Sequence, residues 1–208
     1  MQHLKNYFAY LEKFRAENQI LKTNISENRV VFIGDSIIAG WNSDALFTAN
    51  SHLINRGING QTSTQILIRF TADVLDLKPK CVVVLVGTND VAENNGPISL
   101  EKIQHHFQTI VDVAKSKSCK VILCSILPVA SYYWNSKIIP IPKIKALNHF
   151  LVSLANEESV VYVDFFTALE KDNAMNPLFS DDGVHPNAAG YEIMSHLLLQ
   201  SHHDLLYL

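Results

Sequence analysis

Three short stretches of this chain carry the side chains that acyl transfer needs. Ser36 and Asn89 each follow an apolar run, over 30–34 and 81–86, and Asp182 precedes His185 by three residues. A serine hydroxyl attacks a carbonyl when a neutral imidazole takes its proton, and a carboxylate must orient that imidazole. We therefore expect Ser36 as nucleophile, His185 as general base and Asp182 as the group that orients it.

The same chemistry needs hydrogen-bond donors for the oxyanion that forms on the attacked carbonyl. Three donors suit this role: the backbone N–H groups of Ser36 and Gly60 and the side-chain amide of Asn89. Taken alone, each residue has a structural alternative. Ser36 can cap a helix, Asn89 can satisfy its own turn, and Gly60 can serve only to allow a positive φ.

Asp182 and His185 can also be metal ligands, but no third or fourth ligand follows at a recognisable spacing. The chain also lacks a P-loop and a G-x-G-x-x-G motif. We therefore expect no metal and no cofactor.

These groups must be positioned by a regular alternation of strands and helices. Apolar, β-branched runs predict strands over 30–34, 53–56, 81–86, 120–125 and 160–164. Helical periodicity between them predicts one parallel five-stranded sheet covered on both faces, an α/β fold. The expected helices include residues 3–18, 143–156 and a last helix from Pro186 to about Gln200. Ligands bind at the carboxyl ends of such strands, where Ser36 and Asn89 should lie.

Composition narrows the class of protein. The 208 residues, 48% hydrophobic, predict one domain over 1–208, with 1–25 an N-terminal helical extension packed on it. A net charge of −3 argues against nucleic acid as a partner, and three scattered cysteines do not predict a disulfide framework. Cys81 and Cys124, in apolar runs, are expected to be buried thiols. Without a signal peptide or an 18-residue apolar run, we expect a cytoplasmic protein with no membrane span. The sequence leaves its oligomeric state undetermined.

Four ordered blocks resemble those of SGNH hydrolases, the GDSL esterase/lipase family. Gly34-Asp35-Ser36 matches the first block, 57–62 the second with its glycine at Gly60, 87–90 the third, and 182–185 the DxxH block. The resemblance implies a flavodoxin-like three-layer α/β/α fold and ester hydrolysis through an acyl-enzyme. It implies the roles given above for Ser36, Asp182, His185, Gly60 and Asn89. Ile37 occupies the position of the leucine in Gly-Asp-Ser-Leu, the sequence that gives the family its name. Gln61 stands where many relatives carry aspartate.

The substrate is predicted less closely than the reaction. Tyr132, Tyr133 and Trp134 follow the fourth strand, where aromatic rings can stack on a sugar, flank an acyl chain or simply pack. We expect a small-molecule ester with a short acyl group, acetyl above all, on a carbohydrate or similar alcohol. The alternatives are lysophospholipase or thioesterase activity, or a non-catalytic binding protein that retains the fold.

Other polar residues are expected to have structural roles. Asp35 and Asp90 should hold loops by hydrogen bonds, and Asp181 should be solvated. The pairs His105-His106 and His202-His203 should lie on exposed helix faces.

Overall fold

The centre of the molecule is a parallel sheet of five strands in the order β2-β1-β3-β4-β5. The structure is a computed structural model that describes residues 8–24, 26 and 28–207, with side chains described as far as residue 200. The strands are β1 (Val30–Gly34), β2 (Leu53–Gly57), β3 (Cys81–Leu85), β4 (Lys120–Cys124) and β5 (Val161–Val163). The predicted α/β fold with five parallel strands is confirmed.

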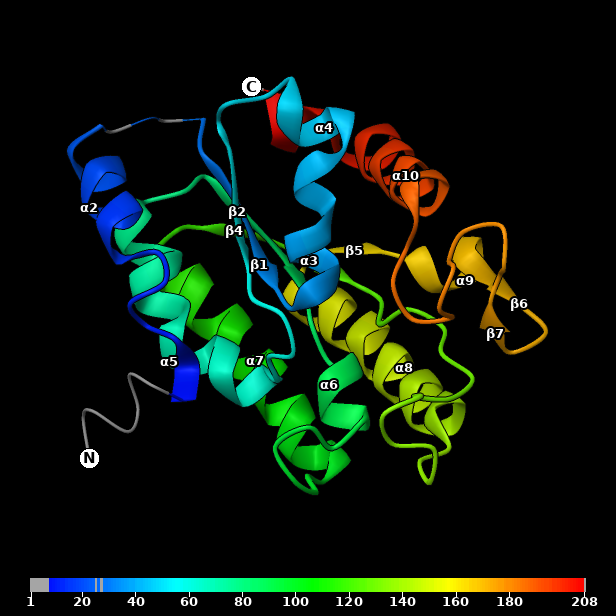
Figure 1. Ribbon diagram of the computed structural model, residues 1–208. Helices are drawn as coiled ribbons and strands as arrows, with labels where there is room; N and C mark the ends of the chain where they lie inside the picture. Colours follow the sequence, from blue (N-terminus) through cyan, green and yellow to red (C-terminus); the bar gives the residue numbers. More distant parts are fainter. Residues whose placement is uncertain (1–7, 25, 27, 208) are drawn as a thin grey trace.

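Helices cover both faces of this sheet and form three layers (Figure 1). On one face lie α5 (Ser63–Asp73), α7 (Leu100–Ser116) and α8 (Pro140–Glu158), and on the other α3 (Ser36–Gly40), α4 (Ala45–Thr48) and α10 (Ala188–Tyr207). Strands β1 and β3 are buried along their whole length, and their alternate residues point to opposite faces of the sheet. In β1, Val31 and Ile33 join the first core, and Val30 and Phe32 join the second.

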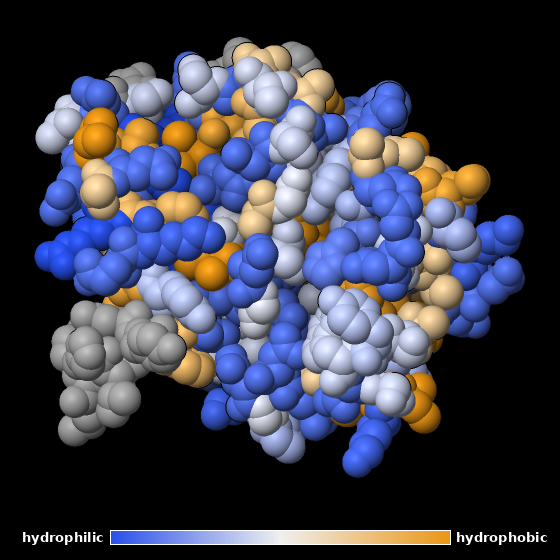
Figure 2. All heavy atoms as spheres, viewed as in Figure 1, coloured by the Kyte–Doolittle hydropathy of each residue, from blue (hydrophilic) through white to orange (hydrophobic). Residues whose placement is uncertain are grey.

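Shorter elements complete the chain. They are α2 (Arg15–Thr23), η1 (Trp41–Ser43), η2 (Leu75–Leu77), α6 (Thr88–Val91), α9 (Phe165–Leu169) and the antiparallel pair β6 (Glu170–Lys171) and β7 (Ala174–Met175). The three cysteines are buried and unpaired. Hydrophilic residues predominate on the face seen in Figure 2, with apolar residues in separate areas. No helix in the described part of the chain is long and apolar enough to cross a membrane.

The predicted N-terminal helix over 3–18 is interrupted in its described part. Residues 1–7 lie outside the described residues. Residues 8–9 and 15–18 are helical, but residues 10–14 form turns, and α2 begins at Arg15. Tyr10 has a φ of 53°, in the left-handed region, which a continuous right-handed helix cannot contain. The ring of Phe14 instead lies 4.5 Å from the Arg56 guanidinium.

The starts of two predicted helices are corrected, and the structure adds one hairpin. Helix α8 begins at Pro140 rather than at residue 143, because proline is well suited to a first turn where its missing N–H has no partner to lose. The last helix begins at Ala188 rather than at Pro186, because Pro186 forms a β-bridge with Ser180. The β6–β7 hairpin was not expected, since each of its strands has only two residues.

Strands β1 and β3 approach closely at their carboxyl ends. The sheet is extended from β1 to one side by β2 and to the other side by β3, so the direction in which strands are added reverses here. A Cβ atom on Gly34 would lie 2.1 Å from the Leu85 carbonyl oxygen, so only glycine fits at the end of β1. This reversal is the place where open α/β sheets bind ligands. The residues directly after β1 and β3 therefore lie side by side at one edge.

A buried arginine joins the segments that surround this edge. The Arg69 guanidinium donates to the carbonyl oxygens of Gly34 (3.0 Å) and Arg56 (2.7 Å), to Gln61 Oε1 (2.6 Å) and to Asp73 Oδ2 (3.1 Å). Burial lowers the pKa of Arg69 to about 10, although the charge of Asp73 acts to raise it. The side chain therefore stays charged at neutral pH and ties β1, β2 and the loop after β2 to α5.

Asp73 extends this network to the N-terminal part of the chain. Its Oδ1 accepts a hydrogen bond from Asn18 Nδ2 at 2.7 Å, and Asn18 Oδ1 accepts from Arg56 at 2.8–3.0 Å. Arg56 also pairs with Glu17 at 3.1 Å. Helix α2 is thus fixed to the sheet through buried polar contacts.

We predict that Arg69→Met lowers the free energy of unfolding by about 3–5 kcal/mol, because it leaves the buried Asp73 carboxylate unpaired. Urea unfolding followed by circular dichroism measures this change. Arg15→Met is the matched control, since Arg15 is exposed and, among the described residues, forms its ion pair with the exposed Glu12. The double variant Arg69→Met/Asp73→Leu should recover part of the loss. Equal stability of Arg69→Met and Arg15→Met would contradict this role for the network.

Candidate active site

Ser36 is the first residue of the short helix α3, directly after β1. The preceding residue, Asp35, caps this helix: its Oδ1 accepts a hydrogen bond from the Ile37 N–H at 3.0 Å. A cap of this kind fixes the backbone where the strand turns into the helix. The Ser36 side chain is thereby held at the carboxyl edge of the sheet, where it is half-buried.

Ser36, His185 and Asp182 form a continuous hydrogen-bonded row. Ser36 Oγ lies 2.9 Å from His185 Nε2, and His185 Nδ1 lies 2.7 Å from Asp182 Oδ2. An ionised carboxylate can only accept, so the hydrogen between His185 and Asp182 belongs to Nδ1. The lone pair on Nε2 then faces the Ser36 hydroxyl, which is the arrangement that proton removal requires.

The Asp182 carboxylate is stabilised as an anion by its own turn. Its Oδ1 accepts from the N–H groups of Val184 and His185, each at 2.8 Å, and from Ser180 Oγ at 3.2 Å. Burial acts to raise the pKa of Asp182, but the hydrogen bonds from His185 and Val184 outweigh it and lower the pKa to about 2. Asp182 is therefore ionised throughout the neutral range and holds the imidazole in one orientation.

Ser36 and His185 open into a pocket of about 570 Å³. Its lining contains polar amides and aromatic rings and, among the described residues, no aliphatic side chain. The lining residues are Tyr10, Ser36, Asn59, Gly60, Gln65, Asn89, Asn94, Asn95, Tyr133, Trp134 and His185. Three further segments, which carry Tyr10, residues 133–134 and His185, therefore meet the residues that follow β1, β2 and β3.

Asn89 lies in this pocket with its amide held by three neighbours. Its Nδ2 is 3.2 Å from Asp35 Oδ2 and 3.1 Å from the Gln61 carbonyl oxygen. Asn94 Nδ2 donates to Asn89 Oδ1 at 2.6 Å, which fixes the amide with its nitrogen on the side of Asp35 and Gln61. Both amide hydrogens already have acceptors, so an oxyanion would have to share one of them.

Gly60 reaches the pocket in the left-handed conformation, with a φ of 75°. The loop that carries it is fixed to the loop after β3 by Ser63. The Ser63 backbone N–H donates to Asp90 Oδ2 at 2.8 Å, and Ser63 Oγ donates to Asp90 Oδ1 at 2.5 Å. These bonds set the distance between Gly60 and Asn89, and they give Asp90 the loop-holding contacts expected from the sequence.

His106 corrects a prediction, because it is buried rather than exposed. Only 6% of its surface is accessible, and its Nδ1 lies 2.8 Å from Ser63 Oγ. Burial lowers the pKa of His106, and Lys102 and His105 lower it further. The hydrophobic periodicity of α7 does not reveal that His106 has a polar partner inside the fold. The side chains of His202 and His203 lie outside the described residues.

The three aromatic residues after β4 do not share one environment. Tyr132 is fully buried and is not part of the pocket lining, and its hydroxyl lies 2.9 Å from Thr88 Oγ1. The centroid of its ring lies 5.0 Å from that of Trp134, so the two rings pack against each other. Tyr133 and Trp134 do line the pocket. The assignment of Tyr132 as a pocket residue is therefore corrected.

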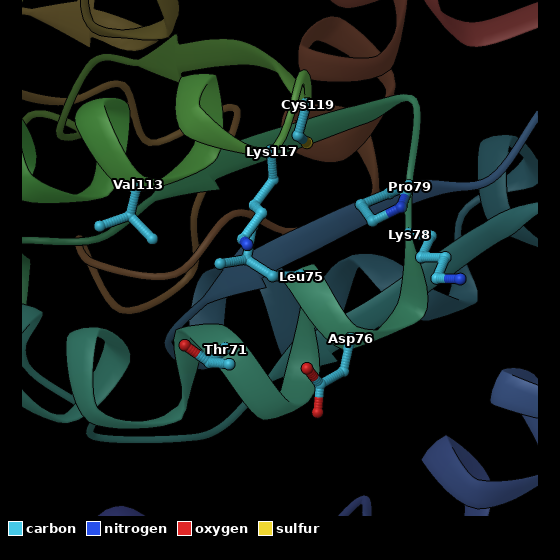
Figure 3. Close-up of a pocket in the computed structure, with 8 residues that line it drawn as sticks. All are labelled: Thr71, Leu75, Asp76, Lys78, Pro79, Val113, Lys117 and Cys119. Carbon is cyan, nitrogen blue, oxygen red and sulfur yellow. The ribbon is translucent and has the colours of Figure 1, made fainter.

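A larger pocket, of about 680 Å³, lies elsewhere on the molecule (Figure 3). Lys78 and Pro79 precede β3, and Lys117 and Cys119 precede β4. It is therefore formed at the amino ends of the strands, the opposite end of the sheet from Ser36. It contains none of the residues predicted to do chemistry.

Sequence reasoning missed several residues of the pocket. Asn94 and Asn95 follow the third block within six residues of Asn89, and their spacing on a tight loop is a signal that could have found them. Gln65 lies on α5, one turn after the second block. Tyr10 has no such signal, because it is far from every block in the sequence.

A model of the GDSL-like lipase/acylhydrolase family matches residues 32–193. The crystal structure of a GDSL-like lipase from Bacteroides thetaiotaomicron is similar, with 36% identity and a TM-score of 0.87, covering 95% of this chain and 98% of that one.

Two characterised relatives are more distant. Thioesterase 1/protease 1/lysophospholipase L1 of Escherichia coli is 25% identical over 89% of this chain and 84% of that protein. The alpha2 subunit of human platelet-activating factor acetylhydrolase IB is 28% identical over 52% of this chain and 48% of that protein. The chain thus spans about half the length of this second relative.

We predict that stability falls as the pH rises from about 4 to 7, in part through Asp35. Burial raises the pKa of Asp35 to about 7, against the hydrogen bond from Ile37, whereas its ordinary value is 3.8. In this range the folded protein keeps a proton that the unfolded chain releases. The contribution is complete below pH 4 and lost above pH 7. Asp90, with a pKa raised by burial to about 6, adds to the decline.

The test is urea unfolding at pH 5, 6, 7 and 8 of the wild type and Asp35→Asn. The decline with pH should be smaller in Asp35→Asn, which can still accept the Ile37 hydrogen bond. Asp76→Asn, at a half-exposed ion pair with Lys22, is the control and should decline as the wild type does. Parallel curves for all three proteins would show that Asp35 does not titrate in this range.

Proposed function

Since the chain belongs to the GDSL-like lipase/acylhydrolase family and is an ester-hydrolysing enzyme, we propose that Ser36 is its nucleophile. The observation that carries this proposal is the row from Ser36 Oγ through His185 to Asp182, with distances of 2.9 and 2.7 Å. The row opens into a pocket, so a substrate carbonyl can reach the hydroxyl. The expected roles of His185 as base and Asp182 as the group that orients it fit the same geometry.

In the proposed reaction, Ser36 Oγ attacks the ester carbonyl carbon as His185 Nε2 takes the hydroxyl proton. The carbon–oxygen bond to the alcohol breaks, and the alcohol leaves with the proton from His185. Water then attacks the acyl-serine while His185 again takes a proton, and this releases the acid and restores Ser36. Asp182 stays ionised and stabilises the imidazolium that forms in each half.

The oxyanion would be stabilised by the N–H groups of Ser36 and Gly60 and by the Asn89 amide. Gly60 and Asn89 line the same pocket as Ser36, and Ser63 and Asp90 hold their two loops together. Because Asn89 Nδ2 already donates to Asp35 and Gln61, its bond to the oxyanion would replace or share one of these. Donors that are fixed before the reaction need no reorganisation as charge develops.

We propose a short acyl group, acetyl above all, on a carbohydrate or similar polar alcohol. The exposed amides of Asn59, Asn94 and Asn95 at the pocket can bond hydroxyl groups. The exposed rings of Tyr133 and Trp134 can stack on a sugar. A long acyl chain would need apolar walls, which the described lining lacks. The similarity to a protein named an acetylhydrolase favours the same acyl group.

Thioesterase or lysophospholipase activity is the second candidate, and the Escherichia coli relative of that name favours it. A cytoplasmic location and a single domain over 1–208 remain predictions from the sequence.

We predict that Ser36→Ala lowers kcat for an aryl acetate about a thousandfold or more, because no other group replaces the nucleophile. The initial rate of hydrolysis with purified protein measures it. Ser43→Ala is the control, since this exposed serine only bonds the Gly40 carbonyl, and it should keep the wild-type rate. A serine-directed phosphonate should label Ser36 in the wild type. A Ser36→Ala protein as fast as the wild type would exclude Ser36 as nucleophile.

We predict that kcat/KM falls at least about tenfold from acetyl to octanoyl esters of one alcohol, because a polar pocket gains little from burying methylene groups. A series of acetyl, butyryl, octanoyl and palmitoyl esters measures this selectivity. A preference for the long chains would instead support the thioesterase or lysophospholipase alternative.

A further inference from the structure

The N-terminal segment contributes a side chain to the pocket of the proposed nucleophile. Tyr10 lines the pocket together with Ser36 and His185, although it precedes every motif of the sequence. About half of its surface is exposed. Tyr10 therefore places part of a large aromatic side chain at the surface of the pocket that contains Ser36.

Two glutamine amides hold this segment in place. Gln61 Nε2 donates to the Ala9 carbonyl oxygen at 3.0 Å, and Gln65 Nε2 donates to the Phe8 carbonyl oxygen at 2.6 Å. Gln61 is held in turn by Arg69, which donates to its Oε1 at 2.6 Å. An amide can accept from Arg69 and donate to Ala9 at the same time, whereas an aspartate at this position could only accept. The position of Tyr10 is thus fixed from the loop that carries Gly60.

The backbone at Tyr10 is also unusual, with a φ of 53° in the left-handed region. This conformation is unfavourable for a residue with a Cβ atom, and it persists where surrounding contacts determine it. The hydrogen bonds to Phe8 and Ala9 supply such contacts. The turn directs the ring to the pocket rather than along a helix.

Tyr133 and Trp134 provide further aromatic surface in the same pocket. Their rings are 4.7 Å apart and edge to face, and the Trp134 indole N–H donates to Asn94 Oδ1 at 2.8 Å. Asn94 in turn donates to Asn89. These rings come from the connection after β4, and Tyr10 comes from a separate segment, with amide side chains in the lining that they share.

We propose that Tyr10, Tyr133 and Trp134 form one aromatic subsite that binds the sugar ring of the alcohol part of the ester. The proposal rests on the proposed function, because it assumes that Ser36 attacks an acylated carbohydrate. Aromatic rings present flat apolar faces to the C–H groups of a sugar ring, and this contact is available whether or not the hydroxyls of the sugar are acylated. Tyr10 is then a specificity-determining residue supplied by the N-terminal segment.

The test compares glucose pentaacetate, which has a sugar ring, with ethyl acetate, which does not. Tyr10→Ala should raise KM for glucose pentaacetate about tenfold and leave kcat within twofold, since it removes binding that ground state and transition state share. The kcat/KM for ethyl acetate should stay within twofold. Tyr10→Phe should behave as the wild type. Ile20→Ala, on the exposed face of α2, is the matched control and should change neither substrate.

A second variant separates loss of the ring from loss of the fold. Tyr10→Gly removes the ring at a position where glycine adopts the observed φ without strain, so circular dichroism and Tm should match the wild type. It should raise KM for glucose pentaacetate as Tyr10→Ala does.

The outcomes distinguish this proposal from the one it rests on. Unchanged KM for glucose pentaacetate in folded Tyr10→Gly would overturn the subsite, and so would an equal loss on both substrates. In either case an inactive Ser36→Ala would leave the proposed function intact. Hydrolysis of both esters by Ser36→Ala at the wild-type rate would instead overturn the proposed function.

Discussion

The buried guanidinium of Arg69 is the interaction on which the geometry of this edge depends. It bonds the carbonyl oxygen of Gly34, immediately before the Asp35–Ser36 turn, and also the side chain of Gln61, directly after Gly60. A charge without solvent around it requires several acceptors at once, and those acceptors come from separate segments. The requirement therefore holds β1, β2 and α5 at fixed distances. It extends through Gln61 to the N-terminal segment at Ala9.

Three aspartates near the site show how the environment sets the state of one side-chain type. Asp182 is a partly exposed carboxylate with several donors, and its pKa is lowered to about 2. Asp35 and Asp90 are buried with fewer donors, and burial raises their pKa to about 7 and 6. The first arrangement suits a group that must stay charged beside an imidazole. The other two suit groups that hold loops, for which either protonation state can form hydrogen bonds.

Much of the fold and of the central row could be predicted from the sequence, because both depend on local signals. The run from Cys81 to Val86 is apolar enough to indicate a strand buried on both faces, and β3 is central in the sheet. Ser36 and His185 occur in short sequence motifs, and the structure places Ser36 Oγ 2.9 Å from His185 Nε2. What could not be predicted depends on contacts between distant segments. Gln61 holds the segment next to Tyr10, Ser63 contacts His106, and Thr88 contacts Tyr132. The periodicity of one helix or loop contains no information about such partners.

The environments of the two tryptophans have a practical consequence. Trp41 is fully enclosed in the second core, with its indole N–H bonded to Ser195, whereas Trp134 is 39% exposed at the pocket and bonded to Asn94. The sequence contains no third tryptophan. Emission that responds to a quencher or to a molecule entering the pocket must therefore come from Trp134, while Trp41 provides a constant background. The protein carries its own optical reporter of occupancy, and no dye needs to be attached.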